Sequence, residues 1–254
     1  MSLDLERTRA LLVEGEVRWS LHYEPSCSST QDLGRSAAIA GADQGWTVIT
    51  DHQLEGRGRH GRLWIAPSET ALLFSTILLP PVDVLPLLPL LAALSVAGGI
   101  EGATGVVAQL KWPNDVLVND HKLAGILLEH PGGAAVILGV GVNVNQPAAD
   151  LPSGATSLLA LTGRSLDREP LLAAILNDLA NAYDRADREG VDWIVPGWRS
   201  RSSMLGKPVA FQRDGATIRG VAEDLGVDGA LLVRLQDGSR VSVISGEVER
   251  LRPD

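Results

Sequence analysis

Residues 56–64 read GRGRHGRLW, and this stretch decides how the rest of the chain is interpreted. Runs typical of core β-strands flank it, WTVIT at residues 46–50 and ALLFSTILL at residues 71–79. Glycine lets a backbone approach a ligand closely, and arginine keeps its charge and offers phosphate oxygens a planar fork of donors. Trp64 adds an apolar face for a base or ring. A single copy of this stretch between two strands predicts a loop that binds a polyphosphate, rather than a solvated linker or an RNA-binding tail.

A second segment predicts a hairpin that carries a carboxylate and an ammonium. Residues 111–115 read KWPND and residues 122–129 read KLAGILLE, with Asn119 and Asp120 as a plausible turn between two apolar runs. Asp115 and Lys122 would then lie close together at the rim of a sheet. Such a pair is usually a surface salt bridge of little consequence, and the arginine-rich loop is what favours a functional reading.

A third segment, GVGVNVN at residues 139–145, ends an apolar strand that begins near residue 134. Alternating glycines remove the side chains from one face of a strand, so that a flat ligand can lie on the backbone. Asn143 follows Gly139 and Gly141 on that same face. A strand bulge is the alternative, and the glycines alone do not exclude it.

In this order the three segments resemble those of the biotin protein ligases, which attach biotin to carrier domains of biotin-dependent carboxylases. Upstream, residues 29–32 read STQD and resemble the family's Ser-Thr-Asn pattern, with Gln31 where asparagine is usual. The resemblance extends from about residue 28 to the C-terminus. It implies a biotin–[acetyl-CoA-carboxylase] ligase of the short form, because the 28 residues before Ser29 are too few for an N-terminal DNA-binding domain.

The fold that this resemblance implies is α+β. Residues 1–204 are expected to form a mixed β-sheet catalytic core with flanking helices, of the class II synthetase/SH2-like type, and residues 205–254 a small SH3-like β-barrel. The sequence supports the division, because helical spacing ends before short alternating runs begin. Helices are predicted at residues 3–13, 31–40 and 168–189, and strands at residues 209–213, 217–223, 230–235 and 240–244, with Asp-Gly turns between them.

The activity implied is activation of biotin with ATP to biotinyl-5'-AMP, with release of pyrophosphate, and transfer of biotin to a lysine of a biotin carboxyl carrier domain. The resemblance assigns catalysis to Lys122, Arg57, Arg59 and Asp115. It assigns biotin binding to Ser29, Thr30, Gln53, Gly56, Arg57, Lys122, Gly125, Gly139 and Gly141. It assigns ATP or adenylate binding to Arg57, Arg59, Arg62, Trp64, Asn114, Lys122 and Asn143.

Magnesium is the expected cofactor, although the sequence does not identify its ligands. Asp115 can be either a carboxylate associated with Mg²⁺ or the group that orients and deprotonates the incoming lysine, and the sequence does not choose between these roles. The five histidines show no metal-ligand spacing. We also expect the arginine-rich loop to be mobile without ligand and to close over the reactive adenylate.

Composition limits the partners. The chain has 254 residues, a formal net charge of −9 and a single cysteine, Cys27. Such a charge does not steer a protein to DNA or to an anionic membrane, and a lone cysteine fits a reducing cytoplasm. Residues 84–100 carry no charge, but two prolines interrupt them and a buried helix is expected there. A monomer or a weak homodimer is expected.

Three competing functions remain open at this point. Lipoate ligases share the fold and the chemistry, but they lack this arginine loop. A biotin-responsive DNA repressor is the alternative from the binding class. A noncatalytic sink for biotin or nucleotide is the third, and Lys122 and Asp115 argue against it.

Overall fold

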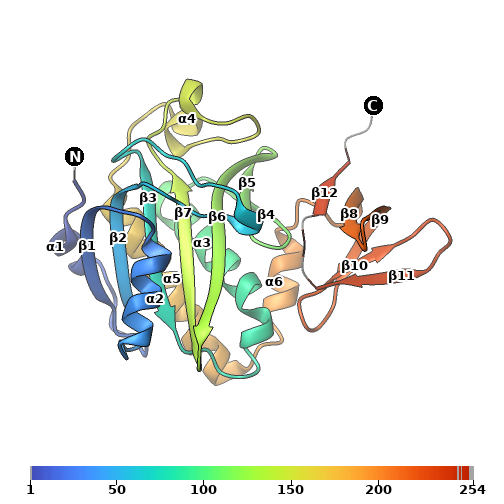
Figure 1. Cartoon of the computed structure of the whole chain (residues 1–254), viewed down its shortest axis with the longest axis horizontal. Coiled ribbons are helices and arrows are strands. Elements are labelled where there is room, and N and C mark those ends of the chain that lie inside the picture. The colour runs from blue at the N-terminus through green and yellow to red at the C-terminus, as the bar shows by residue number, and fades with distance from the viewer. Residues whose placement is uncertain (1, 245, 247, 252–254) are drawn as a thin grey trace.

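A computed structural model describes residues 2–244, 246 and 248–251 of the chain, which form a large sheet with helices and a smaller sheet beside it (Figure 1). The large sheet has the strand order β1-β2-β3-β7-β6-β5-β4. Its strands are β1 (Ser20–Cys27), β2 (Trp46–Gln53), β3 (Ala71–Leu78), β4 (Gln109–Lys111), β5 (Asp115–Val118), β6 (His121–Gly132) and β7 (Ala135–Asn143). β1 and β2 run parallel, and each other neighbouring pair is antiparallel. The predicted mixed sheet is therefore confirmed.

Helices cover both faces of this sheet. Figure 1 shows α2 (Thr30–Ile39) in front of it, and α3 (Leu88–Thr104) and α5 (Arg168–Glu189) behind it. α2 and α5 confirm the helices predicted at residues 31–40 and 168–189. The remaining helices are α1 (Leu5–Arg9), α4 (Leu158–Thr162) and α6 (Ile194–Ser200).

The first helix is shorter than the prediction of residues 3–13. It begins after Asp4, whose side chain caps it, and it ends at Arg9. Beyond it, the side chain of Asn177 on α5 accepts a hydrogen bond from the Val13 amide and donates one to the Leu11 carbonyl. These tertiary bonds replace the helical ones, so the apolar spacing alone overestimated the helix.

The uncharged segment forms the core helix that was expected. Residues 85–104 are long and apolar enough to cross a membrane by composition, but most of that stretch is buried inside the protein. α3 packs along α5 at very short range, because a Cβ on Gly99 would lie 2.5 Å from the Cα of Ile175. A helix buried on nearly all sides is apolar all round, which explains the resemblance to a span.

The C-terminal part is an antiparallel sheet with the order β11-β10-β9-β8-β12. Its strands are β8 (Pro208–Arg213), β9 (Ala216–Leu225), β10 (Leu231–Arg234), β11 (Arg240–Val243) and β12 (Val248–Arg250). The small β domain and its four predicted strands are confirmed, and β12 was not predicted. Closure into a barrel is not observed, because β11 and β12 stay at opposite edges in the described part of the chain. Residues 252–254 of the predicted domain lie outside the described residues.

The small sheet is fastened to the core beside the KWPND segment. The indole of Trp112 is buried and donates a hydrogen bond to the carbonyl of Gly229, at 3.0 Å. Gly229 also approaches the side chains of Leu87 and Leu90 near the start of α3. The second domain therefore adjoins the end of the large sheet that carries the KWPND segment.

Candidate functional site

One cavity brings together most of the residues that the sequence singled out. Its volume is about 980 Å³ including the open mouth, and it lies between the N-terminus of α2, residues 57–64, the β5–β6 hairpin and β7. The predicted residues that line it are Ser29, Thr30, Gln53, Arg57, Arg59, Arg62, Trp64, Asn114, Asp115, Lys122, Gly125, Gly139 and Gly141. Gly56 and Asn143 do not line it. Segments far apart in the sequence thus converge on one concave surface, as binding sites do.

The arginine loop, residues 56–64, folds back on itself as a narrow hairpin. The Trp64 amide donates to the Gly56 carbonyl at 2.8 Å, and the Gly58 amide donates to the Arg62 carbonyl at 2.7 Å. A Cβ on Gly56 would lie 2.3 Å from the Trp64 carbonyl oxygen. Only glycine fits at this crossing, so Gly56 closes the hairpin instead of lining the cavity.

Trp64 lies on the glycine face predicted for β7. A Cβ on Gly141 would lie 2.6 Å from Cε2 of the indole, and one on Gly125 of β6 would lie 2.9 Å from Cζ3. The chain's own indole covers Gly141 and Gly125, and the binding of a flat ligand on this face stays a prediction. A planar ligand that enters the cavity must stack beside this ring or replace it.

The predicted hairpin of β5 and β6 is also confirmed. Asn119 and Asp120 both have positive φ, which is the geometry of a tight two-residue turn. The ammonium of Lys122 lies 2.7 Å from Oδ1 of Asp115 and 5.6 Å from the centre of the Trp64 ring. Both side chains are partly exposed, so solvent weakens the attraction, and the pair is more informative about position than about stability.

Asn143 supports Lys122 from behind the cavity. Its side-chain amide donates to the carbonyl of Thr156 at 2.9 Å and to that of Lys122 at 3.4 Å. It is buried, on the same side of β7 as Gly139 and Gly141. Its face was predicted from alternation, but its hydrogen bonds go to the backbone that carries Lys122.

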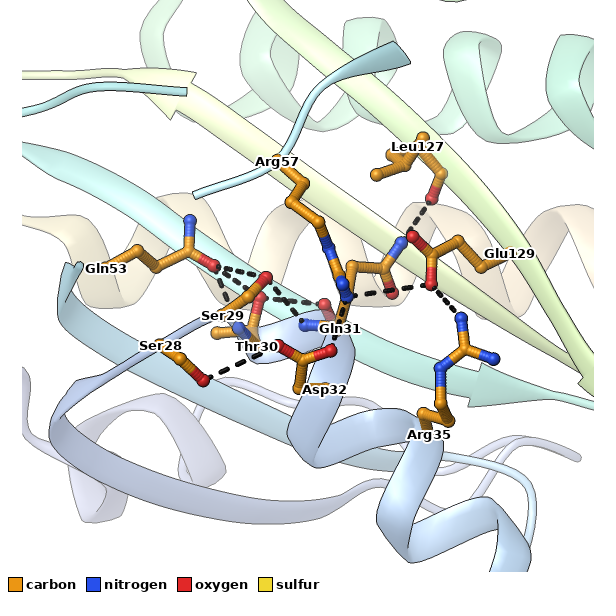
Figure 2. Close-up of polar contacts among 11 residues, drawn as sticks. Ser28, Ser29, Thr30, Gln31, Asp32, Arg35, Gln53, Arg57, Leu127 and Glu129 are labelled. Carbon is orange, nitrogen blue, oxygen red and sulfur yellow. Dashed lines mark hydrogen bonds and ion pairs between the residues drawn. The ribbon is translucent and has the colours of Figure 1, made fainter. Parts of the chain in front are cut away.

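A cluster of neutral polar groups forms the end of the cavity beside α2. Oε1 of Gln53 accepts hydrogen bonds from the Thr30 amide at 2.8 Å, the Thr30 hydroxyl at 3.1 Å and the Ser29 hydroxyl at 3.3 Å. Figure 2 shows the amide nitrogen of Gln53 directed away from this cluster. Ser29 also caps α2. Fixed neutral donors and acceptors of this kind suit an uncharged polar ligand group.

Charged and amide groups gather at the opposite end. Nη1 of Arg59 donates to Oδ1 of Asn114 at 3.2 Å, and the Asn114 side-chain amide donates to the Ile126 carbonyl at 2.6 Å. Arg62 and Lys111 line the cavity as well. The chemistry of this end suits an anion, whereas that of the end beside α2 suits a neutral group.

A buried ion pair fixes the strand that carries Gln53. The guanidinium of Arg168 lies 2.7 Å from Asp51, and both side chains are almost fully buried. The hydroxyl of Tyr23 donates to the other Asp51 oxygen at 2.5 Å. Burial and this hydrogen bond raise the pKa of Tyr23 to about 12. The end of β2 is thereby tied to the first turn of α5.

Several residues around the cavity were not predicted from the sequence. Gln31, noted only as a departure from a pattern, is buried, donates to the Leu127 carbonyl at 3.1 Å and packs on Gly139. Val248 lines the cavity from the second domain. Asp32, Arg35 and Glu129 surround Arg57. Gln31, Asp32 and Glu129 stand in segments that the sequence analysis quoted and could have been found there, whereas no local signal marked Arg35 or Val248.

Comparisons with known proteins agree with this geometry. Residues 23–145 match the Biotin/lipoate A/B protein ligase family, and residues 204–251 match the Biotin protein ligase C terminal domain. The chain is 34% identical to the bifunctional ligase/repressor BirA of Bacillus spizizenii, over 94% of this chain and 79% of that protein. It is 36% identical to the biotin--[acetyl-CoA-carboxylase] ligase of Mycobacterium tuberculosis, over 89% and 86%.

Solved structures give the same picture. The biotin protein ligase from Aquifex aeolicus in complex with biotin and ATP superposes with a TM-score of 0.81, at 29% identity, over 91% of this chain and 99% of that one.

Proposed function

This chain belongs to the biotin protein ligase family, and from that premise we propose that it activates biotin with ATP and transfers it to a protein lysine. In the first step a biotin carboxylate oxygen attacks the α-phosphorus of ATP, and pyrophosphate leaves. In the second step a lysine amine attacks the carbonyl carbon of the mixed anhydride, AMP leaves, and the amine gives up a proton. Both steps move negative charge, so prearranged cations are the main requirement.

The observation that carries the proposal is the division of one cavity into a neutral end and a cationic end. Gln53, with Ser29 and Thr30, suits the uncharged ureido ring of biotin. Arg59 and Arg62 suit the phosphates at the other end. Lys122 lies between these ends, where the carboxylate and the α-phosphate must meet, and it stabilises the charge that both steps develop.

The adenine is assigned to the indole of Trp64 and the amide of Asn114. An aromatic face beside a flat glycine surface suits a purine, and a side-chain amide offers it both a donor and an acceptor. Asn143 contributes through the Lys122 backbone that it holds. Gly125 and Gly141 leave room for the indole that stacks beside the ligand, and Gly139 leaves room for Gln31.

The cavity offers a carboxylate that could bind magnesium. Among the described residues, no group of three or more histidine, cysteine or acidic side chains could hold a metal. Mg²⁺ in nucleotide sites is commonly held by one carboxylate and the substrate phosphates, and Asp115 is the one carboxylate among the described lining residues. Asp115 would hold the ion, which would neutralise phosphate charge. In the second step its carboxylate orients the incoming amine.

The loop is expected to close over the adenylate. Residues 56–64 are expected to become less mobile when ligand is bound. Excluding water there prevents hydrolysis of the mixed anhydride. Digestion of the chain with trypsin, with and without biotin and ATP, tests this, and equal cleavage after Arg59 in both samples would contradict it.

The proposal extends to the partner and the setting. The acceptor is a biotin carboxyl carrier domain of an acyl-CoA carboxylase, and the protein works in the cytoplasm as a monomer or weak homodimer. Residues 1–204 carry the chemistry, and residues 205–254 complete the cavity through Val248. No DNA-binding role is proposed, because the net charge of −9 disfavours it. A gel shift with operator-like DNA checks this.

Exchange of labelled pyrophosphate into ATP tests the reaction, with biotin, lipoate and octanoate as parallel substrates. Exchange with biotin alone is expected. Exchange with lipoate or octanoate alone would assign the chain to lipoate chemistry. Binding of biotin without exchange would indicate a noncatalytic biotin-binding protein.

A further inference from the structure

Arg57, at the base of the arginine loop, directs its guanidinium to two carboxylates outside the cavity lining. Its Nη2 lies 2.7 Å from Oδ1 of Asp32 and 3.7 Å from Oε2 of Glu129 (Figure 2). Neither carboxylate lines the cavity, although Arg57 does. The charge of Arg57 is therefore already balanced without any phosphate.

A fourth charged residue completes the arrangement. Nη2 of Arg35 lies 2.6 Å from the same Glu129 oxygen that faces Arg57, as Figure 2 shows. We name Asp32, Arg35, Arg57 and Glu129 the anchor cluster. Its two positive and two negative groups form one connected network, which holds its geometry better than an isolated surface pair.

The anchor cluster joins three of the elements that form the walls of the cavity. Asp32 and Arg35 lie on α2, whose first turn presents Ser29 and Thr30. Glu129 lies on β6, which presents Lys122 and Gly125. Arg57 belongs to the loop that presents Arg59 and Trp64. A shift of any one element would change the distance between the neutral end and the cationic end.

Asp32 lies in the first turn of α2, where the helix dipole attracts a negative charge. The side chains of Asp32 and Arg57 are 42% and 36% exposed, and that of Glu129 is 20% exposed. The partly exposed Arg57–Asp32 pair contributes little to folding, whereas the less exposed Glu129 contributes more.

We propose that Arg57 is a positioning residue, which Asp32 and Glu129 hold so that it sets the place of the arginine loop over the cavity. This inference rests on the proposed ligase function. It separates Arg57 from Arg59, although both were expected to bind phosphate. Substrate binding depends on the anchor cluster, whereas stabilisation of the moving charge depends on Arg59 and Lys122.

A double-mutant cycle in the exchange reaction tests the proposal. Asp32→Asn combined with Glu129→Gln is expected to raise the KM for biotin and ATP about tenfold with little change in kcat, because a displaced loop weakens binding. Arg57→Ala is expected to do the same. Combining all three substitutions should add little, because each removes the same anchor.

A second measurement, the rate of trypsin cleavage, reports how accessible the loop is. Trypsin should cleave the Asp32→Asn/Glu129→Gln variant after Arg59 and Arg62 faster than the unmodified chain, both without ligand. The matched controls are Asp167→Asn and Glu189→Gln, which remove carboxylates from the exposed pairs with Arg7 and Arg185. These controls should change neither cleavage nor KM.

Two results would overturn the proposal while leaving the ligase function intact. One is a kcat that falls about a hundredfold in Arg57→Ala alone, as expected for a cation in contact with the reacting phosphate. The other is an Asp32→Asn/Glu129→Gln variant with unchanged KM and unchanged cleavage. Failure of the unmodified chain to exchange pyrophosphate would instead refute the ligase function, and the trypsin result would still test the anchor.

Discussion

The base and the tip of the arginine loop contain the same residue types but have different surroundings. At the base, backbone hydrogen bonds cross between Gly56 and Trp64, and Arg57 lies between two carboxylates. At the tip, His60 and Gly61 have positive φ, and Arg59 reaches Asn114 across the cavity. Glycine and arginine content therefore predicts a ligand-binding loop, but it does not tell an anchoring arginine from a ligand-binding one.

Within the loop, the largest expected effect is a loss of kcat on substitution at its tip. Arg59→Ala is expected to lower kcat for pyrophosphate exchange about a hundredfold, because it removes a cation from the end of the cavity that receives phosphate. Steady-state kinetics measure this against Arg57→Ala. If Arg59→Ala instead raised KM with kcat unchanged, Arg59 would behave like the positioning residue Arg57, which would contradict the comparison.

At the base of the loop, we expect activity to depend on Gly56 but not on Gly58. Gly56→Ala would place a Cβ 2.3 Å from the Trp64 carbonyl oxygen, whereas Gly58→Ala would bring one no closer than 3.4 Å to Arg62. We expect Gly56→Ala to lower kcat/KM by about thirtyfold, because the whole hairpin must shift, and Gly58→Ala to have little effect. Equal losses in the two variants would show that the crossing at Gly56 does not hold the loop.

The packing of Trp64 on Gly141 can be tested at the C-terminal end of the loop base. Gly141→Ala would bring a Cβ to 2.6 Å from the indole. The ring must move, so we expect the KM for ATP to rise about tenfold and the tryptophan emission to shift. Gly102→Ala is the matched control, since a Cβ there meets nothing within 4 Å. Unchanged emission in Gly141→Ala would contradict the stacking.

The smallest expected effect is on stability, at Tyr23, which lies outside the arginine loop. Tyr23 has a pKa raised to about 12 in the folded protein, above its ordinary value of 10.0. A raised pKa means that the fold favours the protonated form, so this stabilisation is present below about pH 10 and is lost as the pH rises towards about 12. Denaturant unfolding across that window should show the free energy of unfolding falling less steeply in Tyr23→Phe. The same slope in both proteins would contradict the raised pKa of Tyr23.

Much of the site could be predicted because its signals are local. The turn at Asn119 and Asp120 and the glycine alternation on β7 each depend on neighbouring residues. The structure reproduces both of them. Local rules also gave the four strands of the second domain.

The remaining features depend on partners that are distant in sequence. Asn143 lies on the predicted face, but the partners of its amide come from the Lys122 and Thr156 backbone. Arg57 meets Asp32 and Glu129 only because α2 and β6 flank the loop. Whether the small sheet closes depends on how its edge strands meet, which turn residues do not encode. Periodicity and composition contain no information of this kind.

The central claim is that Lys122 stabilises the charge that develops in adenylate formation, and one measurement tests it most directly. Single-turnover formation of biotinyl-5'-AMP should be at least about a thousandfold slower in Lys122→Ala than in the unmodified chain. Lys207→Ala, at a partly exposed lysine in the second domain, should leave the rate unchanged. Biotin affinity in Lys122→Ala, measured by calorimetry, should fall far less than the rate. A Lys122→Ala variant that forms the adenylate at the normal rate would contradict the account.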